Sequence, residues 1–316
     1  MGFNMKIGLL FSGQGAQQVG MGSDLYEALP VYRETIDQAS AILGYDLATV
    51  VQDETKIFQT QFAQPAILAM SVAIANALGE RLPQPVASLG LSLGEYSALT
   101  VAGAFSFEQA VAIIKDRGAY MQAVGDKNPG KMVAVMGDDQ QLVVDVLTAM
   151  QADGKHVYPA NFNTFSQLVI GGIANDVDEA VVKVTDAGIK RTVELPVTGA
   201  FHTPLLKDAA SQLATRLAEE AFNSLQYPVY SNTTAKPFEV NQLHDILTKQ
   251  ITSPTYFAQD IEQMVADGVD TFIEIGPSET LVKFAKKIAS KTIKRYAITD
   301  LASFNEISEL LMKAEV

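Results

Sequence analysis

The chain of 316 residues contains no cysteine. Neither a disulfide bond nor a thiolate nucleophile is therefore available, and a zinc site would lack its usual sulfur ligands. Histidine is also scarce, with three in the whole chain, so a reaction that needs an imidazole base has few candidates. The absence of cysteine excludes disulfide-stapled scaffolds and cysteine-based catalysis, and the scarcity of histidine narrows the choice of a catalytic base to three residues.

Basic residues are the minority among the charged side chains. Lysine and arginine number 23 against 36 aspartates and glutamates, which gives a formal net charge of −13. Nucleic acids and anionic membrane surfaces repel such a chain, so neither is expected as its main partner.

Long hydrophobic runs are missing as well. No apolar stretch free of charges is long enough to span a bilayer, and the alanine-rich stretch 65–78 indicates a buried helix. The apolar run at 7–11 is too short for a signal-peptide core and indicates a first buried strand. With 48% hydrophobic and 19% charged residues, the composition is that of a globular protein with a full core. We expect a cytoplasmic enzyme.

Short apolar strands alternate with helical stretches through residues 5–127, which is an α/β pattern. From residue 128 the order changes to β-α-β-β-α-β, which is typical of a ferredoxin-like unit, and from about residue 198 the α/β pattern returns. We therefore predict a large α/β subdomain formed by 1–127 and 198–316, with a small ferredoxin-like subdomain inserted over 128–197. A cleft between the two is the expected place for a site. In the first part, strands are expected at 6–11 and 85–90, and helices at 23–43, 65–80, 93–103 and 107–124.

The segment 90–95, with the sequence GLSLGE, is the strongest catalytic motif of the chain. It is a G-x-S-x-G pattern between a short buried strand and a helix that starts near residue 93. A serine on such a tight turn is exposed in a strained conformation, and the flanking glycines let the backbones approach closely. The hydroxyl group of Ser92 would lie near a helix N-terminus, whose N–H groups stabilise an oxyanion. The motif predicts acyl chemistry with Ser92 as the nucleophile, and the simpler alternative is a Gly/Ser turn.

Three histidines compete for the role of catalytic base. His156 lies on a predicted strand and His244 in a polar helical stretch, where structural or solvated roles are ordinary. His202 lies in a loop where the chain returns to the large subdomain, and a loop position next to a helix start suits a base. We therefore predict that His202 is the partner of Ser92.

Two further positions are ambiguous from the residues alone. The turn GQG at 13–15 follows the first strand, but a dinucleotide fingerprint would need glycine at position 18, which is Gln18. The turn either ends a strand or offers the N–H of Gln14, together with that of Leu93, as an oxyanion hole. Arg117 lies at the polar edge of an otherwise apolar helix, where a surface ion pair is the ordinary role.

One local positive face stands out in this acidic chain, because six of its 23 basic residues fall between positions 283 and 295. A solvated helix surface is the simpler interpretation, and a docking face for an acidic partner is the alternative. The six residues are Lys283, Lys286, Lys287, Lys291, Lys294 and Arg295.

Taken together, the chain resembles the malonyl-CoA:acyl carrier protein transacylases, an acyltransferase family, over essentially its whole length. Order and spacing of the matching segments fit that family, and the resemblance implies a hydrolase-like parallel-sheet core with an inserted ferredoxin-like subdomain. The segments are FSGQGAQ (11–17), QPAILAMSVA (64–73), GLSLGEYSAL (90–99), KDRGAYMQ (115–122), NFNTFSQLVIGG (161–172), TGAFHTPLL (198–206), QITSPTYF (250–257) and IEIGPSETL (273–281).

The resemblance also implies a role for each candidate site residue. Ser92 corresponds to the acylated nucleophile and His202 to its base, while Gln14 and Leu93 correspond to the backbone donors of the oxyanion hole. Arg117 corresponds to the residue that binds the malonyl carboxylate. The resemblance therefore favours a site role for Arg117 over the surface ion pair.

Four more positions can be interpreted only through the resemblance to the family. Gln250 corresponds to a residue that lines the site near the histidine, which family members orient through backbone carbonyls, so we nominate no triad acid. Phe201 resembles the form of its motif seen with malonyl rather than methylmalonyl selectivity. Leu91 stands where the family commonly has histidine, and Ser278 where it often has glycine.

The implied reaction moves a malonyl group from malonyl-CoA to the phosphopantetheine thiol of acyl carrier protein, through a malonyl-serine and without cofactor or metal, for fatty-acid biosynthesis. Acyl carrier protein is acidic, so the run 283–295 is the candidate docking face, and we expect a monomer. The alternatives are a serine acyl hydrolase of the lysophospholipase or thioesterase type, a discrete polyketide-synthase acyltransferase, and a non-catalytic binding module.

Overall fold

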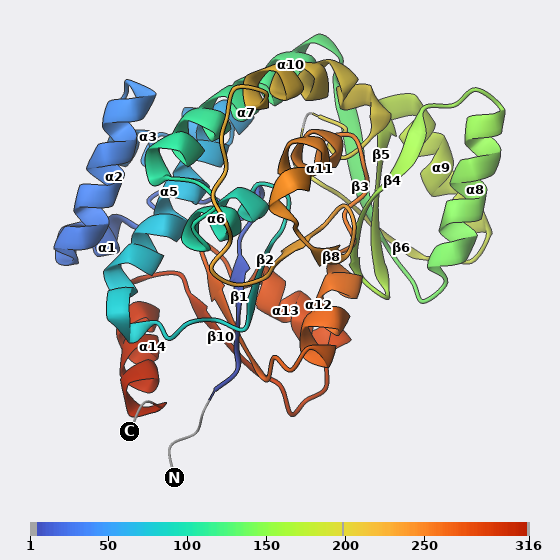
Figure 1. Ribbon diagram of the computed structural model, residues 1–316. Coiled ribbons are helices and arrows are strands. Elements are labelled where there is room, and N and C mark those ends of the chain that lie inside the picture. The colour runs from blue at the N-terminus through green and yellow to red at the C-terminus, as the bar shows by residue number, and fades with distance from the viewer. Residues whose placement is uncertain (1–4, 198, 315–316) are drawn as a thin grey trace.

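A six-stranded sheet forms the centre of the larger part of the molecule (Figure 1). The structure is a computed structural model that describes residues 5–197 and 199–314. The strands lie in the order β10-β9-β1-β2-β7-β8, and all neighbours are parallel except β7 and β8. Their bounds are β1 (Ile7–Phe11), β2 (Ala87–Gly90), β7 (Val229–Ser231), β8 (Lys236–Pro237), β9 (Thr271–Ile275) and β10 (Lys294–Ile298).

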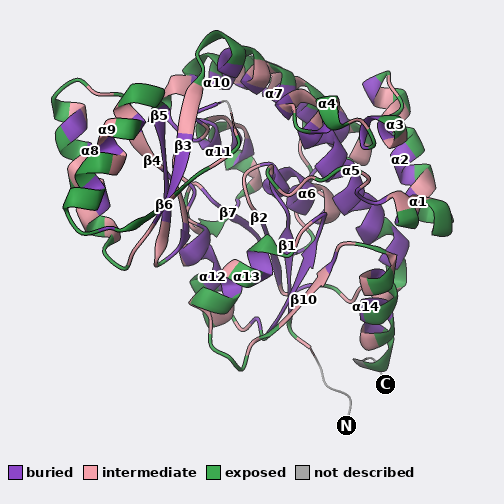
Figure 2. Cartoon of the chain, turned by 180° about the vertical axis from the view of Figure 1, so that it is seen from behind, coloured by how far each residue is buried: buried purple, intermediate pink, exposed green. Residues whose placement is uncertain are grey.

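Helices cover both faces of this sheet, which explains why its central strands are buried throughout. On β1, Leu9 and Phe11 pack into one core cluster and Leu10 into the other. In Figure 2 the strands at the centre are accordingly buried, whereas the outward faces of the surrounding helices are exposed. One layer is built mainly on α5, α6, α7 and α10, and the opposite layer on α12 and α13.

The helices of the larger part have the following bounds: α1 (Ser23–Ala28), α2 (Pro30–Leu43), α3 (Leu47–Val50), α4 (Glu54–Ile57), α5 (Thr60–Leu78), α6 (Gly94–Val101), α7 (Phe107–Lys127), α10 (Lys207–Leu217), α11 (Leu243–Gln250), α12 (Phe257–Ala266), α13 (Thr280–Ile288) and α14 (Leu301–Ala314). Short 3-10 turns cover Gly79–Arg81, Pro204–Leu206 and Val240–Gln242.

A second sheet of four antiparallel strands stands beside the first (Figure 1). It has the order β4-β5-β3-β6, with β3 (Gly130–Met136), β4 (Val157–Thr164), β5 (Gln167–Ile173) and β6 (Arg191–Glu194). The helices α8 (Gln140–Ala152) and α9 (Ala174–Asp186) pack on one of its faces. The predicted order β-α-β-β-α-β is thus confirmed, and with it the α/β class of a parallel core with a small second sheet. The subdomain boundaries remain predictions, and residue 198 lies outside the described residues.

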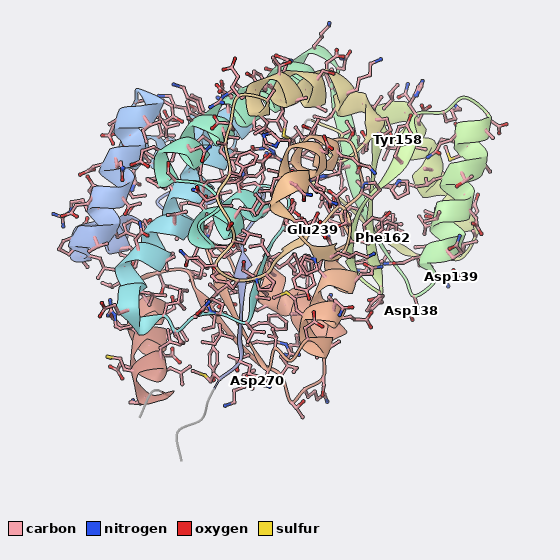
Figure 3. All side chains as sticks on the ribbon, in the orientation of Figure 1. Asp138, Asp139, Tyr158, Phe162, Glu239 and Asp270 are labelled. Carbon is pink, nitrogen blue, oxygen red and sulfur yellow. The ribbon has the colours of Figure 1, made fainter. Side chains whose placement is uncertain are left out.

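A short seam joins the small sheet to the larger part. The N–H of Thr255 donates to the carbonyl of Ala160 at 2.9 Å, and the N–H of Phe162 donates to the carbonyl of Thr255 at 2.8 Å. Phe162, labelled in Figure 3, stacks on Tyr256 with ring centroids 5.2 Å apart. These contacts fix β4 against the segment that follows α11.

Two expected helices differ from the structure. The stretch 23–43 is two helices, because Pro30 begins α2 and the residue before a proline is driven out of the helical region, as Leu29 is with φ −114° and ψ 108°. The helix expected at 65–80 begins at Thr60, since Pro65 is accommodated inside α5 rather than at its start. By length and composition the stretch Thr60–Arg81 could cross a membrane, but 72% of its most apolar window is buried inside the protein.

Candidate active site

Ser92 lies on a tight turn between β2 and α6. Its φ of 54° is one of only three positive values among the described non-glycine residues. A Cβ atom at Gly90 would lie 1.8 Å from the carbonyl carbon of Gly94, and one at Gly94 would lie 2.1 Å from the carbonyl oxygen of Phe11. Only glycine fits at both positions, so β1, β2 and α6 meet closely beneath Ser92. This is the geometry of a nucleophile elbow.

His202 is held in a buried loop beside the same cleft. It has a φ of 60° and is 4% exposed. Its Nδ1 lies 2.9 Å from the backbone carbonyl oxygen of Gln250, which keeps the proton on Nδ1 and leaves Nε2 as the acceptor of the neutral ring. Burial lowers the pKa of His202 to about 4, and the Gln250 carbonyl opposes this only in part. The ring is therefore neutral at neutral pH, as a general base must be.

Arg117 is fully buried behind Ser92. Its Nη2 donates to Ser92 Oγ at 3.2 Å and to Gln250 Oε1 at 2.9 Å, while its Nη1 donates to Gln64 Oε1 at 2.6 Å. The guanidinium also lies over the ring of Tyr96, with its central carbon 5.3 Å from the ring centroid. Among the residues that the structure describes, Arg117 forms no ion pair and its Nε has no hydrogen-bond partner.

The expectation of a surface ion pair, which rested on the position of Arg117 at the polar edge of its helix, is therefore wrong. The helix α7 packs closely on α5, since a Cβ atom at Gly118 would lie 3.1 Å from the carbonyl oxygen of Thr60. That close packing encloses the guanidinium. Burial lowers the pKa of Arg117 because desolvation penalises its charge. Such a group binds an anion that reaches it far more strongly than an exposed arginine does.

Two backbone donors lie beside the elbow. A Cβ atom at Gly13 would lie 2.4 Å from the carbonyl oxygen of Leu91, so the turn at 13–15 presses directly against the elbow. Within residues 5–197 and 199–314, the N–H of Gln14 and the N–H of Leu93 donate no hydrogen bond. Leu93 is buried, whereas Gln14 is half-buried and lines the cleft, and both N–H groups belong to the positions predicted for an oxyanion hole.

A cleft of about 730 Å³ lies between the two sheets with Ser92 and His202 in its lining, whereas Leu93, Arg117 and Gln250 are fully buried outside that lining. Gln14, Ser92 and His202 line its larger side, and Met132 and Val169 of the small sheet line the other. Ser92 and His202 thus share one cavity, and no hydrogen bond joins them among the described residues. Such contacts often form only when the substrate is bound.

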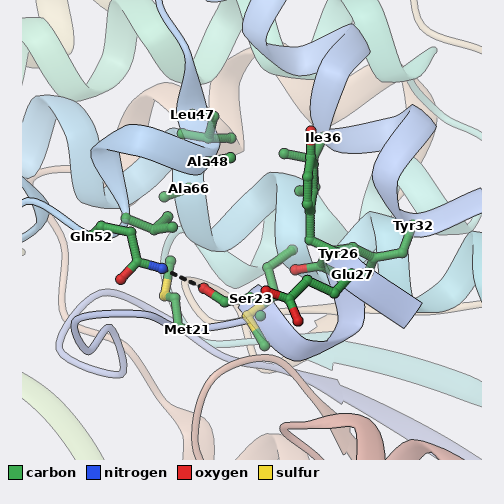
Figure 4. A pocket seen from close by; sticks show the side chains of 13 residues that line it. Met21, Ser23, Tyr26, Glu27, Tyr32, Ile36, Leu47, Ala48, Gln52 and Ala66 are labelled. Carbon is green, nitrogen blue, oxygen red and sulfur yellow. Dashed lines mark hydrogen bonds between the residues drawn. The ribbon is translucent and has the colours of Figure 1, made fainter. Parts of the chain in front are cut away.

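A smaller cavity of about 150 Å³ lies elsewhere, between α1, α2, α3 and α5 (Figure 4). Among its lining residues, Gln52 Nε2 donates to Ser23 Oγ at 2.6 Å, and Tyr26, Tyr32 and Met70 also line it. Neither a histidine nor an arginine lines it. The cleft at Ser92 is therefore the better candidate for acyl chemistry.

The other two histidines lie outside the cleft lining. His156 is exposed just before β4, with its Nδ1 3.2 Å from the hydroxyl of Tyr158. His244 is half-buried on α11, where its Nε2 lies 3.0 Å from the carbonyl oxygen of Glu220 and its ring packs on Phe222. Both have structural or solvated surroundings.

The basic run 283–295 is divided between elements. Lys283, Lys286 and Lys287 are exposed on α13, whose Leu281 and Phe284 line the cleft. Arg295 is instead half-buried on β10 and donates to four backbone carbonyls, those of Ile293, Ala285, Ala289 and Ser290. Part of the run thus borders the cleft, and Arg295 serves the packing of α13.

Several polar residues of the site were not predicted from the sequence. Glu95 is fully buried one turn after Ser92, and Asn232 accepts the Ser92 N–H through Oδ1 at 2.7 Å. Gln64 accepts from Arg117. A carboxylate three residues after the nucleophile on an apolar helix is a signal that could have found Glu95. Asn232 lies in an unremarkable loop, so no local pattern marks it.

The geometry is that of a nucleophile elbow in a cleft shared with a buried histidine, and the comparisons with known proteins identify the family. The acyl transferase domain family matches residues 9–303, so the chain belongs to this family. Within it, a malonyl CoA-acyl carrier protein transacylase from Haemophilus influenzae is 36% identical over 312 residues, which cover 97% of this chain and 99% of that protein.

Solved structures give the same answer. The crystal structure of MCAT from Streptococcus pneumoniae has a TM-score of 0.92 and 43% identity, and the match covers 96% of this chain and all of that one (100%). A malonyl-transacylase in complex with a type II PKS acyl-carrier protein has a TM-score of 0.92 and 35% identity, covering 96% and 99% of the two chains.

Proposed function

We propose that the chain transfers a malonyl group from malonyl-CoA to the phosphopantetheine thiol of acyl carrier protein in fatty-acid biosynthesis. The observation that carries this proposal is Arg117, a fully buried guanidinium that contacts Ser92 Oγ and forms no ion pair with any described residue. A hydrolase of simple acyl chains has no use for such a charge. A substrate with a free carboxylate satisfies it.

The reaction follows a ping-pong course. His202 Nε2 takes the proton of Ser92, whose Oγ attacks the thioester carbonyl of malonyl-CoA, and the tetrahedral intermediate expels CoA, which leaves as the thiol with that proton. The carrier thiol then gives its proton to His202 and attacks malonyl-Ser92, and the ester oxygen returns to Ser92 as the hydroxyl. No cofactor enters these steps.

Two sets of contacts supply selectivity and rate. The N–H groups of Gln14 and Leu93 are each expected to stabilise the oxyanion by about 2.7–4 kcal/mol. Contact of Arg117 with the malonyl carboxylate is expected to contribute about 1.5–3 kcal/mol, or roughly 10- to 150-fold over acetyl-CoA. Phe201 lines the cleft beside His202, where its ring would crowd an α-methyl group.

The exposed lysines of α13 are the proposed docking face for the acidic carrier protein. Phe284 lines the cleft. Lys287 follows Phe284 by three residues on α13, so the two side chains are neighbours on the helix surface. The proposed face consists of the exposed lysines Lys283, Lys286, Lys287, Lys291 and Lys294 without Arg295, since Arg295 donates to four backbone carbonyls. A cytoplasmic location and a monomeric state belong to the same proposal.

Covalent labelling tests the proposed function most directly. The protein is incubated with malonyl-CoA labelled in the malonyl group, denatured and counted, and we expect label that is retained by the wild type and lost in Ser92→Ala. A second assay measures free malonate with and without holo carrier protein. A transacylase loads the carrier, whereas malonate release that ignores the thiol acceptor would indicate a hydrolase, and no retained label would indicate a binding module.

A polyketide carrier protein is the second candidate acceptor. The similar malonyl-transacylase found in complex with a type II PKS acyl-carrier protein favours it. Loading rates measured side by side on fatty-acid and polyketide carrier proteins decide between them. A higher kcat/KM with the polyketide carrier would reassign the pathway and leave the chemistry unchanged.

A further inference from the structure

We propose that Glu95 is a positioning residue that sets the orientation of the Gln250 side-chain amide and, through it, the carboxylate-binding geometry of Arg117. The proposal rests on the proposed function, because it explains how the selectivity of that same site is built. Glu95 does not line the cleft, so its effect passes through its two partners: the side chain of Gln250, and the backbone of Asn232, whose side chain accepts the Ser92 N–H.

Both carboxylate oxygens of Glu95 are engaged as acceptors. Oε1 accepts the backbone N–H of Asn232, and Oε2 accepts the Nε2 of Gln250. The side chain is fully buried in the first turn of α6, where no water competes for these donors. Burial raises the pKa of Glu95 to about 8, whereas the hydrogen bonds donated by Asn232 and Gln250 and the nearby charge of Arg117 oppose that rise and favour the ionised form. In that form the carboxylate offers two acceptors, whereas an amide in its place offers one acceptor and one donor.

The amide of Gln250 has one orientation that satisfies its surroundings. Its Nε2 donates to Glu95 and also to the carbonyl oxygen of Ser92 at 3.0 Å, so its Oε1 faces Arg117 Nη2 at 2.9 Å. If the amide rotated by half a turn, its NH₂ group would face the guanidinium, and a donor would oppose a donor. The acceptor Oε2 of Glu95 therefore determines that Arg117 faces the Oε1 atom of Gln250 rather than its NH₂ group.

The neighbouring carboxyl group of Asp260 provides a matched comparison. It is equally buried, and its Oδ2 accepts from Asn232 Nδ2 at 3.3 Å, but its Oδ1 has no hydrogen-bond partner. An amide at position 260 can therefore still present an oxygen to Asn232 and turn its NH₂ group to the unoccupied side. An amide at position 95 has no such freedom.

The variants Glu95→Gln and Asp260→Asn thus remove one buried carboxyl each but differ in donor–acceptor pattern. The quantity to measure is the ratio of kcat/KM for malonyl-CoA to that for acetyl-CoA with one carrier protein. This ratio does not depend on the fraction of folded enzyme. We expect Glu95→Gln to lower it by roughly 10-fold, the scale of one hydrogen bond to a charged group, and Asp260→Asn to leave it unchanged.

Arg117→Ala serves as the reference that separates the two proposals. If the ratio does not change in Arg117→Ala, the proposed role of Arg117 fails. If it falls in Arg117→Ala but stays at the wild-type value in Glu95→Gln, or falls equally in Asp260→Asn, only the role of Glu95 is overturned. Should Glu95→Gln not fold, Glu95→Ala carries the same expectation. Failure of both to fold, with Asp260→Asn folded, would assign Glu95 a purely structural role.

Discussion

The buried region behind Ser92 and the exposed face of α13 both carry positive charge, but they hold it in opposite ways. Arg117 is fully buried, bonded to two glutamine side chains and to the nucleophile, whereas Lys286 and Lys287 are exposed at the end of a helix. A buried charge has fixed geometry and little screening, so it can select one chemical group. Exposed charges are mobile and screened, so they attract a partner without specifying it.

Replacement of Arg117 by alanine tests the buried charge behind Ser92 and should have the largest effect. We expect the preference for malonyl-CoA over acetyl-CoA to fall by roughly 10- to 150-fold, because the carboxylate loses its charged partner. Steady-state kinetics with both substrates measure this. Arg216→Ala is the control, since Arg216 pairs with Asp116 and Glu220 away from the cleft lining. An equal loss in the control would contradict the assignment.

The pH dependence of kcat/KM tests whether burial lowers the pKa of His202. A base must be neutral, and burial lowers the pKa of His202 to about 4, so protonation should disable it only as the pH falls through that value. At about pH 5.5 an imidazole with an ordinary pKa would be only about one-tenth neutral, whereas His202 should be almost wholly neutral. We therefore expect kcat/KM for malonyl-CoA to be nearly flat between pH 7 and 5.5. A fall of about eightfold over this interval, which an imidazole with an ordinary pKa would give, would contradict the buried base.

Neutralising the rim should have the smallest effect. In the double variant Lys286→Ala and Lys287→Ala, we expect KM for the carrier protein to rise by roughly 2- to 10-fold, as exposed ion pairs are weak. Malonyl-CoA hydrolysis without carrier should be nearly unchanged, and the effect should shrink with added salt. Lys183→Ala, on α9 of the small sheet, is the matched control. An unaltered KM would remove α13 from the docking face.

The sequence predicted the parts of the site that follow local rules. A serine between glycines at a strand-to-helix turn requires the elbow, and the element order at 130–194 follows from alternating apolar patterns. The surroundings of Arg117 could not be predicted in this way. Its partners Gln64 and Gln250 come from distant segments, and only the packing of α7 on α5 encloses the guanidinium. From its helix position alone, the residue has the pattern of a surface charge.

The segment from Gln250 to Tyr256 performs two tasks at once. At one end, the carbonyl of Gln250 holds the imidazole of His202, and at the other end Thr255 and Tyr256 are fastened to β4. The contacts that position β4 and the hydrogen bond that orients the His202 imidazole therefore belong to one short segment. A substitution that weakens the contacts of Thr255 or Tyr256 with β4 is therefore expected to disturb the orientation of the His202 imidazole as well.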